Sequence, residues 1–292
     1  MDFLIKLKDI DRRIIYVVIA LAVSLPILVQ FDFPVFPGKN VITLHSFIEK
    51  LEPGQRCFLS FDYDLASMPE LHPAAVAVLS HMMERGIKPI CGANWPLGGD
   101  MGESALVRAL EITTEKLTKL GKPRTFVKGV DYVNVGYKPG AIVHVKRMVA
   151  DFLSPFPADR DGNSTSNMKI FQNEDGSRFS MNDIGIIVSF TAGTGGIETF
   201  ISIAGDHKRK MAAACTSVNI PRFYTYIQTG QLTGMIGGMP GAAEYEKMID
   251  FAGPARLGMV PQSVSHLVII LFIIVGNMAY LAEKSRQAKK SY

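Results

Sequence analysis

The fold is decided by Ile184-Gly185-Ile186-Ile187-Val188-Ser189-Phe190 and the glycine-rich turn after it, Thr191-Ala192-Gly193-Thr194-Gly195-Gly196. The first run is apolar without alternation, which is typical of a strand buried on both faces of a parallel sheet. A helical pattern, 196–205, follows the turn. A buried strand, a tight turn and a helix in this order predict one crossover unit of an α/β domain.

The same alternation of short apolar runs and helical patterns extends in both directions along the chain. Strands are predicted at 57–63, 87–92, 124–130, 184–190, 210–218 and 232–236, and helices at 69–85, 102–120, 140–152, 196–205, 221–229 and 242–249. Five or six strands with about as many helices predict one α/β domain with a doubly wound, mainly parallel sheet.

Residues 154–183 interrupt this order, because they are polar and lack helical periodicity. Lys169–Gln172 and Ser177–Ser180 flank Asn173-Glu174-Asp175-Gly176, which predicts a projecting β-hairpin insertion able to contact a partner. The segment that starts at Asp159 begins like a calcium-binding loop. It carries Ser164 and Ile170 where such a loop has Gly and Glu, so a solvated turn is favoured.

Two charge-free apolar runs, Ile14–Val29 and Val264–Leu281, bracket the domain. They predict transmembrane helices at 14–33 and 264–281, with the α/β domain at 34–263 between them. A cleaved signal peptide is the alternative for the first run. Its only small-residue cleavage pattern, Ala20-Leu21-Ala22, lies inside the apolar run, which favours an uncleaved anchor.

Basic residues gather in the two tails, at 1–13 and 282–292. Such tails stay on the cytoplasmic side of a membrane, so the domain is expected to be extracytoplasmic and the bilayer to be one partner. Of 31 basic and 27 acidic residues, the tails hold eight and four, which leaves 23 of each for the rest of the chain. Nucleic-acid binding requires a basic surplus, so a nucleic-acid partner is not expected.

Cys57, Cys91 and Cys215 each lie in or beside an apolar segment. Cys57 and Cys91 could form a disulfide if their strands are neighbours, but buried free thiols are the favoured interpretation. The six histidines are scattered, and no cluster of Cys and His has zinc-site spacing. No metal and no cofactor is therefore predicted.

Polar residues follow the predicted strands where each ends. They are Asp62, Tyr63 and Asp64, then Asn94 and Trp95, then residues 191–196, and finally Thr216, Ser217 and Asn219. Ligands of open parallel sheets bind beyond the carboxyl ends of the strands, so these groups are expected to converge on one rim.

The glycine-rich turn is one candidate ligand site on this rim. Its members and one neighbour are the predicted ligand-binding residues: Thr191, Gly193, Thr194, Gly195, Gly196 and Ser217. Backbone N–H groups at a helix start can bind a carboxylate or a phosphate. The turn has neither the Lys-Ser/Thr ending of a P-loop nor the G-x-G-x-x-G spacing, and tight-turn geometry alone is the other explanation.

Phe61-Asp62-Tyr63-Asp64 places two carboxylates on alternate residues at a strand end. This segment resembles the first motif of haloacid-dehalogenase-type phosphatases over about eight residues. The resemblance implies a nucleophile at Asp62, an acid/base at Asp64, adjacent Mg²⁺, and supporting roles for Ser189 and Lys208. The Gly-Thr continuation is replaced by Leu65-Ala66-Ser67, and the later acidic pair is missing. The alternative is that both carboxylates only order the loop.

Two further patterns bear on function. Cys215 could act as a nucleophile with His144 or His207, although its neighbours Ala212–Ala214 indicate a core strand. The densest glycine stretch, Gly230–Gly241, allows close backbone packing and predicts an interface with another chain.

With no complete catalytic set, the sequence favours a non-enzymatic subunit or scaffold of a membrane-associated assembly, formed by self-association or with other subunits. A membrane-tethered, metal-dependent hydrolase using Asp62 and Asp64 is the first alternative. A domain that senses a small ligand at the glycine-rich turn is the second.

Overall fold

A computed structural model of the protein describes residues 11–29, 34–140, 142–193 and 195–290. The chain forms two compact units, one made of Met1–Pro34 with Arg256–Tyr292 and the other of Val35–Ala255. Residues 1–10 and 291–292 of the predicted tails, and 30–33 of the first predicted span, lie outside the described residues. Each unit is described by itself.

The larger unit contains a six-stranded, all-parallel sheet with the order β3-β2-β1-β4-β5-β6. Its strands are β1 (Arg56–Asp62), β2 (Lys88–Ala93), β3 (Val133–Tyr137), β4 (Ile184–Thr191), β5 (Met211–Cys215) and β6 (Met235–Gly237). The prediction of a parallel α/β sheet is confirmed. The strand order reverses between β1 and β4, and this is the position at which open α/β sheets bind ligands.

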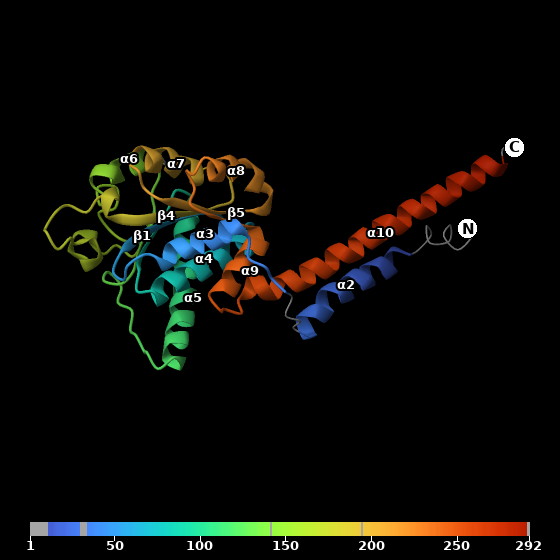
Figure 1. Ribbon diagram of the computed structural model, residues 1–292, viewed down its shortest axis with the longest axis horizontal. Coiled ribbons are helices and arrows are strands. Elements are labelled where there is room, and N and C mark those ends of the chain that lie inside the picture. Colours follow the sequence, from blue (N-terminus) through green and yellow to red (C-terminus); the bar gives the residue numbers. More distant parts are fainter. Residues whose placement is uncertain (1–10, 30–33, 141, 194, 291–292) are drawn as a thin grey trace. The chain divides into compact units, whose positions relative to one another are not determined.

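Helices cover both faces of the sheet (Figure 1). One face carries α3 (Lys39–Glu49), α4 (Met68–Glu84), α5 (Gly98–Lys119) and α9 (Gly238–Met248). The other carries α6 (Ile142–Ala150), α7 (Ile197–Asp206) and α8 (Ile220–Gln228). The central strands are buried almost throughout because both of their faces meet helices, which explains their continuous apolar sequences.

The predicted third strand at 124–130 is wrong, and β3 lies a few residues later. Residues around Asp131 form a turn instead: its carboxylate accepts hydrogen bonds from the Val127 backbone N–H and the Arg124 guanidinium. Gly129 has a φ of +76°, which lies outside the extended range of regular strand backbone. Because of this turn, β3 begins only at Val133, the first of four buried residues.

The sequence prediction also missed α3. Leu44 and Ile48 on this helix are completely buried. A Cβ atom on Gly234 would lie 2.6 Å from the Asn40 carbonyl oxygen, so α3 passes directly over that glycine. Gly237 and Gly241 likewise meet residues of this chain, Ile220 and Ile236. Close packing inside the domain therefore accounts for these glycines, which the sequence analysis assigned to an interface with another chain.

The predicted hairpin insertion at 154–183 is wrong as well. Its described residues form three short 3₁₀ helices, Thr165–Asn167, Lys169–Phe171 and Met181–Asp183. Phe156, Phe171 and Phe179 are buried in the hydrophobic core. The segment packs against the sheet because these apolar side chains outweigh its polar composition.

Asp159, the first residue of the calcium-like segment, is bound by the chain itself. Its carboxylate accepts hydrogen bonds from the Asn163 and Asp161 backbone N–H groups. Lys128 Nζ lies 2.8 Å from Asp159 Oδ2 and also contacts Asp161. These contacts make the segment an ordered turn closed by a lysine.

The smaller unit contains α2 (Arg12–Val29) and most of α10 (Pro254–Lys290). By length and composition, α2 and the Pro254–Arg286 part of α10 could each cross a membrane. Only 6% of the most apolar window of each is buried. The second helix begins ten residues before the predicted span at 264–281.

All three cysteines are buried and free. Cys57 and Cys91 do lie on neighbouring strands, but the register pairs Cys57 with Pro89 and Leu59 with Cys91. Their side chains are therefore offset along the sheet. Burial raises the pKa of the Cys57 thiol to about 12 and that of Cys91 well above its ordinary value.

Candidate functional site

A pocket of about 280 Å³ opens at the carboxyl ends of β1, β2 and β4, where the strand order reverses. It brings together the polar residues predicted after the first two strands and part of the glycine-rich turn. Its lining consists of Asp62, Tyr63, Asp64, Ser67, Asn94, Trp95, Ala192, Gly193 and Gly195. The predicted convergence on one rim is therefore found for three of the four strand ends.

Asp62 lies at the base of this pocket with only 4% of its surface exposed. Ser60 Oγ donates a hydrogen bond of 2.7 Å to Oδ2, and the Asn94 backbone N–H donates one of 2.7 Å to Oδ1. Burial raises the pKa of Asp62 to about 6, against the lowering effect of these hydrogen bonds. The carboxylate is thus held firmly in place and is costly to ionise.

Asp64 has a different role two residues later. Its Oδ1 accepts hydrogen bonds from the backbone N–H groups of Ala66 and Ser67. This arrangement orders the turn that leads into α4, as Asp commonly does at such positions. The carboxylate is half-buried and lines the pocket, so it also adds negative charge at the mouth.

Asn94 and Trp95 contribute the groups that are free to meet a ligand. Both polar atoms of the Asn94 side chain, Oδ1 and Nδ2, are buried and have no hydrogen-bond partner among the described residues. Buried polar atoms without partners destabilise the free protein; a ligand N–H or O–H would satisfy Oδ1, and a ligand oxygen would satisfy Nδ2. Trp95 is 47% exposed beside it and offers an aromatic face.

The glycine-rich turn approaches the Asp62 carboxylate. A Cβ atom on Gly196 would lie 2.7 Å from Asp62 Oδ2, so only glycine permits this contact. Asp62 therefore places the chain's own negative charge at the start of α7, where the sequence analysis expected a carboxylate or phosphate ligand. Thr191 is buried and donates its hydroxyl to the Gly193 carbonyl oxygen. Thr194 lies outside the described residues.

Ser217, the other predicted ligand-binding residue, is not in this pocket. It lines a separate one with Gly38 and Tyr224. Its backbone N–H donates to Glu70 Oε2 at 2.8 Å. Asn219 Nδ2 donates to the Ala192 carbonyl oxygen, and this bond ties the end of β5 to the glycine-rich turn.

A partly buried pair, formed by the pocket-lining Tyr63 and by His72, was not predicted from the sequence. The Tyr63 hydroxyl and His72 Nδ1 are 2.9 Å apart, and Tyr63 is almost completely buried. Burial lowers the pKa of His72, which favours its neutral form. The pair fixes the start of α4 against the end of β1. The nine-residue separation of Tyr63 and His72 gives no such indication in the sequence.

The remaining catalytic candidates are dispersed. Lys208 lies in the turn between α7 and β5, at the opposite edge of the sheet from Asp62. Cys215 is buried in β5 beside Met235, and burial raises the pKa of its thiol to about 12. A thiol in this environment stays protonated and is a poor nucleophile at neutral pH.

The charges that line this pocket determine which ligands it attracts. It is lined by two carboxylates, and none of its described lining residues is basic. Anions such as phosphate are repelled by that field, whereas a cation is attracted. Comparison with known proteins gives no further guidance, because no family model, curated protein or solved structure matches the chain.

Proposed function

We propose that the chain is a membrane-anchored α/β binding protein whose pocket at the carboxyl edge of the sheet takes a small ligand with an ammonium group. The observation that carries this proposal is the pocket at the β1/β4 reversal, which combines Asp62, Asp64 and Trp95 without a basic side chain among its described lining residues. Carboxylates and an exposed indole are the groups that recognise organic cations in proteins.

Asp62 supports a cation rather than a neutral ligand. A buried carboxylate without a positively charged neighbour is destabilised by desolvation, which here raises its pKa. A cation in the pocket would offset that cost by pairing with the ionised form. The Asn94 Oδ1 acceptor then satisfies one of the ammonium N–H groups.

The membrane anchor and the binding function form one proposal. The predicted positive-inside arrangement places both tails in the cytoplasm and the domain outside, where it would meet ligands from the surroundings. Participation in a larger assembly remains a prediction. The glycine packing inside the domain removes one argument for it, so the pocket now carries more weight than an interface does.

The hydrolase alternative receives less support from the geometry. Asp62 is held by two donors, Asp64 orders a turn, and Lys208 lies at the other edge of the sheet. A nucleophilic carboxylate must be free to approach phosphorus with a basic group nearby. The pocket supplies neither condition among its described residues.

Ligand binding can be followed by the fluorescence of Trp95, because it is the single tryptophan of the chain and lines the pocket. The full chain in mild detergent is titrated with putrescine, choline, glucose and inorganic phosphate while tryptophan fluorescence is recorded. We expect saturable changes with putrescine or choline at millimolar or lower concentrations, and none with glucose or phosphate.

Two variants serve as matched tests. Asp64→Asn removes a charge from the mouth and is expected to weaken putrescine binding several-fold, whereas Asp175→Asn removes an exposed charge outside the pocket and should leave it unchanged. A saturable response to phosphate alone, or no response to either organic cation, would contradict the proposal.

A further inference from the structure

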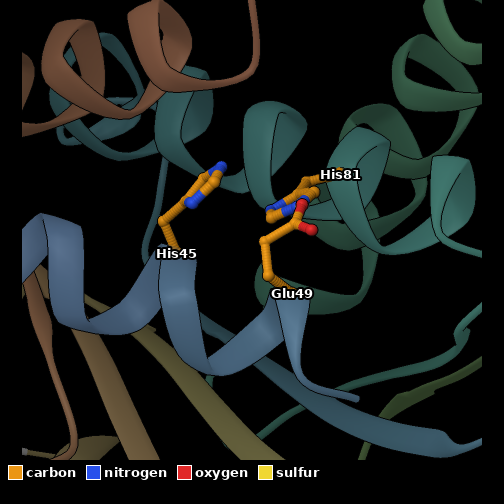
Figure 2. A group of neighbouring side chains, drawn as sticks. All are labelled: His45, Glu49 and His81. Carbon is orange, nitrogen blue, oxygen red and sulfur yellow. The ribbon is translucent and has the colours of Figure 1, made fainter. Parts of the chain in front are cut away.

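A second group of chemically active side chains lies on the helical face made by α3, α4 and α9. His45 and Glu49 are four residues apart on α3, so they project from the same side of the helix. His81 comes from α4 and points toward them (Figure 2). Each of the three residues offers a nitrogen or carboxylate oxygen, and these atoms all lie within 4.8 Å of one another.

His81 is held from both sides. Its Nδ1 lies 2.8 Å from the hydroxyl of Tyr245, and its Nε2 lies 2.7 Å from Glu49 Oε1. Tyr245 is completely buried on α9 and fixes the orientation of the imidazole ring. Histidines that bind metals almost always have a hydrogen-bond partner on the other ring nitrogen, and Tyr245 provides it here.

His45 is the adjustable member of the group. Its ring stacks on that of His81, with centroids 4.5 Å apart and 18° between the planes. Among the described residues it has no hydrogen-bond partner, and it is only half-buried. One of its ring nitrogens already lies within 4.8 Å of the ligand atoms of His81 and Glu49.

Most charged groups around the cluster are paired with one another. Arg85 Nε lies 3.7 Å from Glu49 Oε2, which leaves Oε1 facing the histidines. Lys116 of α5 pairs with Glu84 of α4 at 2.8 Å, so its charge is neutralised. Lys122 and Asp250 also line the surrounding cavity and carry opposite charges.

We propose that His45, Glu49 and His81 form a binding site for a divalent transition-metal ion, Zn²⁺ by its ligand set. Two imidazoles and one carboxylate are a common ligand set of zinc sites that keep an open position. Mg²⁺ and Ca²⁺ prefer oxygen ligands and are not expected to bind here. The metal takes the place of the proton between His81 Nε2 and Glu49 Oε1.

The site opens to a cavity of about 480 Å³, so water can occupy the fourth position. It is separate from the pocket at the carboxyl edge. His81 and Glu84 lie in the last turn of α4, and a crossover helix ends at the amino edge of a parallel sheet. Metal binding at this cluster therefore does not depend on ligand binding at the carboxyl edge.

The test uses the full chain in mild detergent, purified with an affinity tag that contains no histidine. Zn²⁺ affinity is measured by competition with a chromophoric chelator, and Co²⁺ binding by its visible d–d absorption. We expect one equivalent of Zn²⁺ or Co²⁺ to bind, with an intense cobalt spectrum typical of low coordination number, while excess Mg²⁺ and Ca²⁺ do not compete.

His45→Gln and Glu49→Gln each remove one ligand and are expected to weaken Zn²⁺ binding at least tenfold and to reduce the cobalt absorption. His207→Gln is the matched control, because His207 is exposed on the turn after α7. Circular dichroism and the unfolding temperature without metal verify that each variant folds. Unchanged affinity in both ligand variants, equal loss in the control, or failure of the wild type to bind would overturn the proposal.

Discussion

Two carboxylates at opposite edges of the sheet have opposite surroundings. Asp62 is buried at the carboxyl edge with two neutral donors, and its pKa is raised to about 6. Glu49 is 42% exposed on α3 beside His81 and Arg85, and its pKa is lowered. Among the described residues, the first carboxylate has no cationic neighbour, whereas the second is already paired with His81 and Arg85. The two proposals follow from this difference: a cation from outside the chain for the first edge, and a metal ion held by the chain's own side chains for the second.

The largest expected effect comes from disrupting the carboxyl edge itself. A Cβ atom on Gly98 would lie 1.8 Å from the Phe61 carbonyl oxygen, where α5 starts beside the end of β1. We expect Gly98→Ala to destabilise the domain by about 3 kcal/mol or more, measured by urea unfolding.

Gly205→Ala is the control for that change, because a Cβ atom there meets nothing within 4 Å. It lies in α7, so we expect it to be neutral or stabilising by up to about 1 kcal/mol. Equal losses in the two variants would show that the tight contact between α5 and β1 is not important for stability.

The second prediction concerns the pH dependence that Asp62 imposes. Its pKa is about 6 in the folded protein, against 3.8 for the free side chain, so the native state binds this proton more tightly. The stabilising contribution is fully present below pH 3.8 and is lost as the pH rises to about 6.

We therefore expect the stability of Asp62→Asn relative to wild type to rise by roughly 2–3 kcal/mol between pH 4 and pH 7, since the amide does not ionise. Urea unfolding at several pH values measures this difference without added ligand. A difference that stays constant over this range would mean that burial does not perturb Asp62.

A smaller effect should distinguish the two serines beneath the pocket. Ser60 donates to Asp62, and its replacement by Ala is expected to cost about 1 kcal/mol. Ser189 Oγ is buried and has no hydrogen-bond partner among the described residues, so Ser189→Ala is expected to be neutral or slightly stabilising. Unfolding free energies at pH 7 test the pair, and the reverse order would contradict the assigned hydrogen bonds.

The smallest effect is expected at the other edge. Without metal, Glu49→Gln keeps an oxygen that can accept a hydrogen bond from His81, and it removes only a partly exposed charge. We expect a stability change of about 0.5 kcal/mol or less at pH 7. A loss as large as that of Gly98→Ala would make the cluster a structural element and not an adaptable ligand set.

The sheet was predictable from the sequence wherever packing leaves a local signal. Ile184–Thr191 is buried on both faces, and its unbroken apolar run indicated this directly. The helix α3 is also visible in the sequence, since Val41, Leu44 and Ile48 recur at helical spacing, although no helix was predicted there. The hairpin prediction was wrong because a few aromatic residues, such as Phe171 and Phe179, determine how this segment packs, although the segment is polar on average.

The candidate sites were predictable only in part. Asp62, Asn94 and Gly195 converge because the carboxyl ends of neighbouring parallel strands must meet, which is a property of the fold. The grouping of His45 with His81 depends on how α3 and α4 pack, and no spacing in the sequence expresses it. The unpartnered Asn94 oxygen is likewise visible only once the pocket is assembled.

The central claim is that ionised Asp62 receives a cation, and the pH dependence of putrescine binding tests it most directly. Trp95 fluorescence in the full chain gives the dissociation constant from pH 4.5 to pH 8. We predict a constant affinity above about pH 6 and roughly tenfold weaker binding for each pH unit below it, with this dependence abolished in Asp62→Asn. An affinity that does not change across the range, or the same profile in Asp62→Asn, would contradict the account.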